Sequence, residues 1–227
     1  TVKREGVDLV FAVDVSKSML AEDIAPNRLE KAKRLVSETI NKLSGDRVGI
    51  IAYAASAVPQ LPITTDYESA KLFLQSLNTD MLSSQGTAIA EAIDLSKNYY
   101  DDENQTNRVL VILSDGEDHE DGAEMAATTA ANEGITIFTI ALGTEKGGVI
   151  PLKQKGVTSS FKKDVEGEVV ITRMNKDVLQ TVADNTGGLM LIGDNTNEVV
   201  NAITNRLVEM DKAEFEAKQF VRFKDQY

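Results

Sequence analysis

Two aspartates with hydroxyl side chains close by are the strongest candidates for chemistry in this sequence. Asp14 is followed by Val15-Ser16-Lys17-Ser18, which places two hydroxyls at alternate residues of one turn, and Asp115 follows a second apolar run. Gly86-Thr87 supplies a third hydroxyl from a polar segment. Carboxylate and hydroxyl oxygens are hard donors that suit Mg²⁺, Mn²⁺ or Ca²⁺ rather than zinc or copper. The candidate ligands of a divalent cation, Mg²⁺ first, are Asp14, Ser16, Ser18, Thr87 and Asp115.

Such a ligand set predicts binding rather than catalysis. Two carboxylates close together repel each other and raise each other's pKa unless a cation lies between them. Because few of the ligands are charged, water should complete the coordination and one position should stay exchangeable. A cation in that state attracts an incoming carboxylate, such as one on a protein partner. We expect Lys17, Gly86 and Glu117, beside the ligands, to contact that partner.

Strands and helices alternate along the chain, and this order explains how the candidate ligands could meet. Residues 8–14 and 109–113 are apolar without alternation, which is typical of strands buried on both faces of a parallel sheet. In an open parallel sheet, ligands bind outside the carboxyl ends of the strands, where Asp14 and Asp115 stand. Further strands are expected at residues 47–54, 57–63, 135–142 and 189–192. Helical spacing of apolar residues predicts helices within residues 26–43, 70–77, 123–132, 178–183 and 199–210, and around Ile89.

The expected fold class is α/β: a doubly wound, Rossmann-like sheet of about six strands. The sheet should be mostly parallel, with residues 57–63 as one antiparallel edge strand because they contain Pro59 and Pro62. Residues 1–211 are expected to form this domain, with a β-hairpin insert at about 144–173. Residues 212–227 are expected to form a tail that leads to a membrane segment outside this chain.

Composition excludes several classes of function. A formal net charge of −12 argues against nucleic-acid binding, which needs a basic surface. The absence of cysteine excludes disulfides and zinc–thiolate sites. No stretch approaches the roughly 20 apolar residues of a membrane helix.

The pattern Asp14-Val-Ser16-Lys-Ser18, with Thr87 and Asp115 downstream, resembles the metal-ion-dependent adhesion site of von Willebrand factor A and integrin I domains. All five positions match in the order that the family has. The resemblance implies a protein-binding module that is not an enzyme, with a metal that accepts a carboxylate from the protein ligand.

A second resemblance covers nearly the whole chain. The segments 28–33, 45–49, 86–89, 114–118 and 147–151 are similar to those of the bacterial Bat aerotolerance proteins, the BatB branch especially. That family implies an inner-membrane-anchored protein whose domain faces the periplasm and serves a stress-tolerance complex. Partners implied by the resemblance are other Bat proteins or a MoxR-type AAA+ ATPase system.

Other interpretations stay open for particular residues. Asp14, Ser16 and Ser18 alone could form a helix cap, and the acidic residues among 117–121 could form the first turn of a helix rather than a second cation site. His119 is expected to be a solvated or capping side chain. The lysines of the insert could be solvated or could dock an acidic partner. The alternative function is a Mg²⁺-dependent hydrolase or phosphotransfer protein that uses the strand-end aspartates.

Overall fold

The computed structural model describes residues 6–84, 86–100 and 107–224. At its centre lies a six-stranded sheet in the order β10-β5-β4-β1-β2-β3. Its strands are β1 (Val7–Asp14), β2 (Arg47–Tyr53), β3 (Ala57–Thr64), β4 (Asn107–Ser114), β5 (Ile135–Ala141) and β10 (Met190–Ile192). All neighbouring pairs are parallel except β2 and β3, which are antiparallel at one edge. The predicted doubly wound sheet with one antiparallel edge strand is confirmed.

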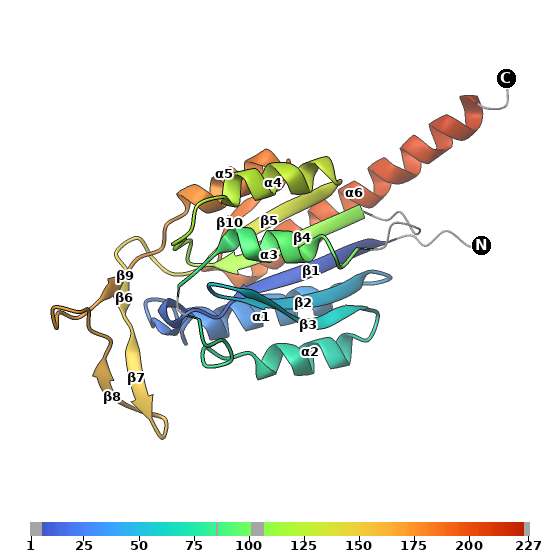
Figure 1. Ribbon diagram of the computed structural model, residues 1–227. Helices are drawn as coiled ribbons and strands as arrows, with labels where there is room; N and C mark the ends of the chain where they lie inside the picture. The colour runs from blue at the N-terminus through green and yellow to red at the C-terminus, as the bar shows by residue number, and fades with distance from the viewer. Residues whose placement is uncertain (1–5, 85, 101–106, 225–227) are drawn as a thin grey trace.

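Two layers of helices cover the sheet (Figure 1). The helices are α1 (Arg28–Asn41), α2 (Tyr67–Ser76), α3 (Ile89–Ser96), α4 (Ala123–Asn132), α5 (Asp177–Asn185) and α6 (Thr196–Lys224). One hydrophobic core joins α1, α2 and α6 to one face of the sheet, and a second core joins α3, α4 and α5 to the other face. Because both faces are covered, every residue of β1 is buried, which explains its continuous apolar sequence.

Two local expectations were wrong. The first helix does not open at Pro26 but at Arg28, because Asn27 caps it by accepting a hydrogen bond from the backbone N–H of Glu30 at 2.8 Å. The acidic residues at 117–121 do not form the first turn of a helix. They lie in the loop before α4, which begins at Ala123 after Gly122, a residue with φ of 112°.

The insert at about 144–173 contains more than one hairpin. Strands β6 (Gly148–Val149) and β9 (Ile171–Thr172) pair with each other, and β7 (Pro151–Gln154) pairs with β8 (Val157–Phe161). The insert projects from the end of the domain where β1 and β4 finish, whereas the second half of α6 extends from the opposite end (Figure 1).

Helix α6 runs for 29 residues through the boundary expected at residue 211, so the tail up to Lys224 continues the last helix. Phe215, Phe220 and Phe223 on this part are exposed. No helix in the described part of the chain is both long and apolar enough to cross a membrane.

Candidate functional site

The predicted ligands lie at the carboxyl ends of the central strands. Asp14 is the last residue of β1, and Asp115 directly follows β4, which pairs with β1. Ser16 and Ser18 stand where β1 turns into a short 3₁₀ helix, η1 (Lys17–Leu20), and their Oγ atoms lie 3.1 Å apart. All five predicted ligands have buried side chains: Asp14, Ser16, Ser18, Thr87 and Asp115.

Asp14 is held by donors from two segments. Its Oδ1 accepts from the backbone N–H of Ser16 at 2.9 Å, and its Oδ2 accepts from the hydroxyl of Ser114 at 2.8 Å. Burial first, and then the nearby charge of Asp115, raise the pKa of Asp14 from 3.8 to about 7, against the hydrogen bonds from Ser16 and Ser114. Burial also raises the pKa of Asp115, against a hydrogen bond from Ser18 and the positive charge of Arg28. Two buried acids with raised pKa values form a site that a cation would stabilise.

Thr87 provides an independent test of whether these residues suit a metal ion. Its backbone N–H donates to Nδ1 of His119 at 3.1 Å, and its carbonyl oxygen accepts from the backbone N–H of His119 at 2.9 Å. Its hydroxyl, by contrast, is buried and has no hydrogen-bond partner. An unsatisfied buried hydroxyl costs about 1–3 kcal/mol, so its presence needs a reason. Coordination of a cation would give this oxygen a partner, and the residues present therefore fit a metal.

The same part of the structure contains a second buried hydroxyl without a partner, that of Tyr53. Tyr53 ends β2 and lies opposite Asp14 in the sheet register. Burial raises the pKa of Tyr53 well above its usual range, and the charge of Asp14 adds to this. The phenol therefore stays neutral and adds no charge to the site.

Sequence reasoning missed the role of Arg28. Although it opens an amphipathic helix, this arginine has no exposed surface, and its Nη1 donates to Oδ2 of Asp115 at 3.0 Å. Its Nε and Nη2 form a two-point ion pair with Asp23 at 2.8 and 2.7 Å. The only signal in the sequence was that Arg28 lies in one of the segments similar to Bat proteins; helical periodicity could not show what it contacts.

Arg28 also joins the candidate site to the insert. It donates to the Oγ1 and to the carbonyl oxygen of Thr172 on β9, both at 3.0 Å. The hydroxyl of Thr172 in turn donates to Oε1 of Glu117 at 2.7 Å. The end of the insert is thus fixed against the loop that carries Asp115.

The three residues expected to contact a partner stand next to predicted ligands or within two residues of them in the sequence. Lys17 forms an ion pair with Asp80 and a hydrogen bond with Thr79. Gly86 has φ of 108°, a conformation that favours glycine. Glu117 is engaged by the insert, as described above. Their contact with a partner stays a prediction.

His119 is exposed, and its Nδ1 accepts the backbone hydrogen of Thr87, the residue before the N-cap of α3. No three His, Cys, Asp or Glu side chains cluster as a metal site in the described residues. The predicted set has two carboxylates and depends on hydroxyls for its other donors.

The sheet order and the rim of buried oxygens define a class of protein. The von Willebrand factor type A domain family matches residues 9–117 of this chain. A solved aerotolerance-related membrane protein from Bacteroides fragilis, carrying multiple mutations to serine, is 40% identical with a TM-score of 0.85. The match covers 90% of this chain and 100% of that chain. The chain therefore belongs to the von Willebrand factor type A domain family.

Within that family, the chain is related to the Bat aerotolerance membrane proteins. The structure of BatB from Bacteroides thetaiotaomicron is 41% identical, with a TM-score of 0.86, over 91% of this chain and 99% of that chain. A UPF0353 protein of Mycolicibacterium gilvum is 28% identical over 217 residues, or 90% of this chain. The chain spans about 60% of the length of that curated relative.

Proposed function

We propose that this domain is a metal-dependent, adhesion-type protein-binding module of a membrane-anchored bacterial envelope complex. The observation that carries the proposal is the buried Thr87 hydroxyl without a partner, at a rim where Asp14 and Asp115 are buried as well. Asp14, Ser16, Ser18, Thr87 and Asp115 would hold the cation, Mg²⁺ first, with Mn²⁺ or Ca²⁺ as substitutes. The bound cation would supply the positive charge to which a carboxylate of the partner binds.

The protein's own residues prepare this site. Ser114 and the backbone of Ser16 orient the carboxylate of Asp14, while Arg28 orients that of Asp115. Because these donors are fixed before a ligand arrives, little ordering is left for the binding step. The similarity to Bat proteins supports a role in stress tolerance, with the domain in the periplasm and other Bat proteins or a MoxR-type AAA+ ATPase system as partners.

Calorimetric titration with Mg²⁺ and with Mn²⁺ tests the metal site. We expect saturable binding that is lost in Asp14→Ala and retained in Glu209→Ala, a control that removes an exposed acid from α6. The domain should then bind a labelled glutamate-containing peptide in Mg²⁺ and release it in EDTA. Absence of saturable metal binding at millimolar concentrations would overturn the proposal. Hydrolysis of a phosphate ester that requires both Mg²⁺ and Asp14 would instead support the enzymatic alternative.

A further inference from the structure

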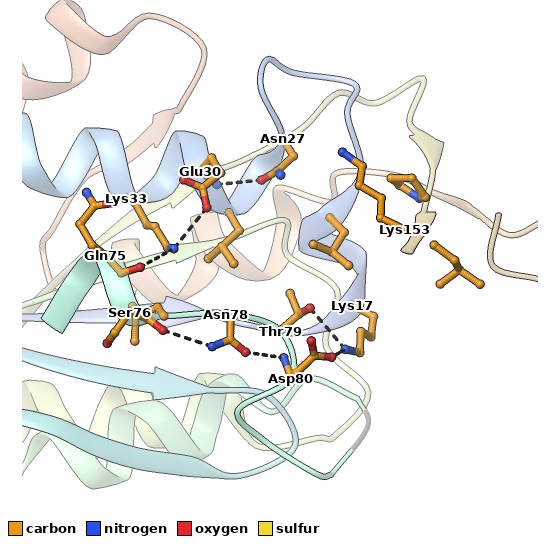
Figure 2. Close-up of a pocket in the computed structure, with 15 residues that line it drawn as sticks. Lys17, Asn27, Glu30, Lys33, Gln75, Ser76, Asn78, Thr79, Asp80 and Lys153 are labelled. Carbon is orange, nitrogen blue, oxygen red and sulfur yellow. Dashed lines mark hydrogen bonds and ion pairs between the residues drawn. The ribbon is translucent and has the colours of Figure 1, made fainter. Parts of the chain in front are cut away.

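A groove of about 580 Å³ is lined in part by Lys17, the residue between the predicted ligands Ser16 and Ser18 (Figure 2). Its lining includes Lys17 and Leu20 of η1, the turn that carries Ser16 and Ser18, and residues Pro151 to Lys153 of β7. Helix α1 and residues 75–80 complete its lining. The groove, which we name the η1–β7 groove, therefore connects the metal-site turn to the insert.

The lining of the η1–β7 groove is mostly polar, with paired charges and a few apolar side chains. Leu20, Leu29, Leu77 and Leu152 line it. The lysines that line it already have acidic partners: Lys17 with Asp80, Lys33 with Glu30 at 3.2 Å, and Lys153 with Glu22 at 3.0 Å. All three acids are partly or largely exposed, and exposed ion pairs are worth only about 0–1 kcal/mol. An incoming carboxylate could replace them at small cost.

The surplus of positive charge lies on the β7–β8 hairpin that borders the groove. Residues 151–163 contain four lysines and no acidic residue, in a chain of net charge −12. Lys155, Lys162 and Lys163 have no acidic partner within the described part of the chain. The hairpin also exposes Val157 and Phe161, at 70% and 42%. It is a basic surface with apolar side chains on an acidic protein.

The backbone of β7 offers a further means of binding. In its sheet, β7 pairs only with β8. Strand β8 lies on the outer side and β7 on the side of the domain, and it is β7 that lines the groove (Figure 1). An unpaired strand edge is a template for adding an extended segment of another chain.

We propose that the η1–β7 groove and the β7–β8 hairpin bind an extended acidic segment of the same partner that would donate a carboxylate to the metal. This inference rests on the proposed function and identifies the chemistry of the partner. The hairpin lysines would attract the acidic side chains, the edge of β7 would pair with the backbone, and the groove would lead the segment to the metal site. The Arg28–Thr172 contacts hold β9, at the end of the insert, beside the loop that carries Asp115.

The test measures binding of a fluorescent peptide of alternating Glu and Val by anisotropy, in Mg²⁺ at low salt, with a Lys–Val peptide for comparison. Reversing three charges in Lys155→Glu/Lys162→Glu/Lys163→Glu should weaken binding of the acidic peptide roughly tenfold or more, and added salt should weaken binding to the native domain. The matched control, Lys42→Glu/Lys212→Glu/Lys224→Glu, makes the same change of net charge at exposed sites beyond α1 and on α6, and should retain most of the affinity.

A second pair of variants tests the groove itself. Leu152 is 42% exposed and lines the groove, whereas Val165 is exposed elsewhere on the insert and does not line it. Leu152→Asp should weaken peptide binding by roughly fivefold or more, since it places a negative charge where the peptide would lie, and Val165→Asp should change it little. Thermal unfolding of both variants checks that the insert stays folded.

The possible outcomes separate the two proposals. If peptide binding is lost in Asp14→Ala or in EDTA but kept in the hairpin and Leu152 variants, the proposed role of the groove is wrong. The proposed metal-dependent function would then still hold. Loss only in the hairpin and Leu152 variants would overturn the metal-dependent function and leave an acidic-segment groove. Hairpin-dependent binding to phosphatidylglycerol vesicles without peptide binding, or hairpin-dependent self-association in sedimentation, would show that the occupant is a membrane or a second copy and would overturn the inference.

Discussion

Arg28 donates to Asp115 across 3.0 Å, and neither side chain has any exposed surface. The pair joins the first turn of α1 to the residue after β4, and Thr172 extends the contact to the insert. The cation of Arg28 therefore offsets part of the burial that raises the pKa of Asp115. Asp14 has no ion pair with a basic side chain among the described residues. A bound cation should therefore stabilise the charge of Asp14 more than that of Asp115.

Removing Arg28 should destabilise the domain strongly. Arg28→Met leaves Asp115 and Asp23 without their cation, and breaking a buried ion pair costs about 3–5 kcal/mol. Urea unfolding monitored by circular dichroism measures the change. Arg34→Met, an exposed arginine on the same helix, is the control and should lie within about 0.5 kcal/mol of the native domain. Equal stability of the two variants would contradict the role assigned to Arg28.

Replacing Thr87 should separate metal binding from stability. Thr87→Val removes a buried hydroxyl that has no hydrogen-bond partner, so the metal-free domain should keep its stability or gain about 1 kcal/mol. Affinity for Mg²⁺ should fall roughly tenfold or more, because a ligand is lost.

The matched control for that variant is Thr139→Val. Its hydroxyl donates to the carbonyl oxygen of Leu179 at 2.9 Å and lies within β5. We expect it to lose about 1 kcal/mol of stability while its affinity for Mg²⁺ stays unchanged. Unaltered Mg²⁺ affinity in Thr87→Val would remove Thr87 from the ligand set.

The loop after Asp115 should tolerate no side chain at Gly116. A Cβ there would lie 1.7 Å from the carbonyl oxygen of Asn175, whereas a Cβ at Gly134 would meet nothing within 4 Å. Their φ values are 79° and 78°, so both substitutions carry the same backbone strain. In thermal or urea unfolding, Gly116→Ala should therefore cost about 1–3 kcal/mol more than Gly134→Ala. Equal losses of stability in the two variants would contradict the close contact between Gly116 and Asn175.

The stability of the metal-free domain should depend on pH through Asp14, and bound metal should remove this dependence because it displaces the proton. The pKa of Asp14 is raised from 3.8 to about 7 in the folded, metal-free domain, so the folded state holds a proton that the unfolded chain has lost. Between about pH 4 and pH 7 the stability of the metal-free domain should therefore fall as pH rises, and this contribution should level off above about pH 7.

Urea unfolding in EDTA across that range measures this effect, with Asp14→Asn as the variant that cannot titrate and should show a weaker dependence. Mg²⁺ affinity should rise with pH over the same range, because the cation displaces the proton. Parallel pH curves for the native domain and Asp14→Asn in EDTA would contradict the assignment.

The sequence determined the elements and the candidate ligands. Continuous apolar runs showed strands buried on both faces, helical spacing gave the covering helices, and the prolines of residues 57–63 marked an edge strand. These features follow from the local periodicity of apolar residues, which can be read directly from the sequence. The order Asp14, Ser16, Ser18, Thr87, Asp115 could be recognised because each residue stands where a strand or loop ends at one rim.

Only the tertiary structure decided what connects these parts. Arg28 contacts Asp115 and Thr172, which are 87 and 144 residues away, and no local pattern encodes pairing over such separations. Arg28 stands at the start of a helix, and its burial against two carboxylates and a carbonyl oxygen depends on segments that the tertiary structure brings to it. The sequence also could not predict that the Thr87 hydroxyl has no hydrogen-bond partner. Whether a buried oxygen has a partner depends on which distant segments pack against it.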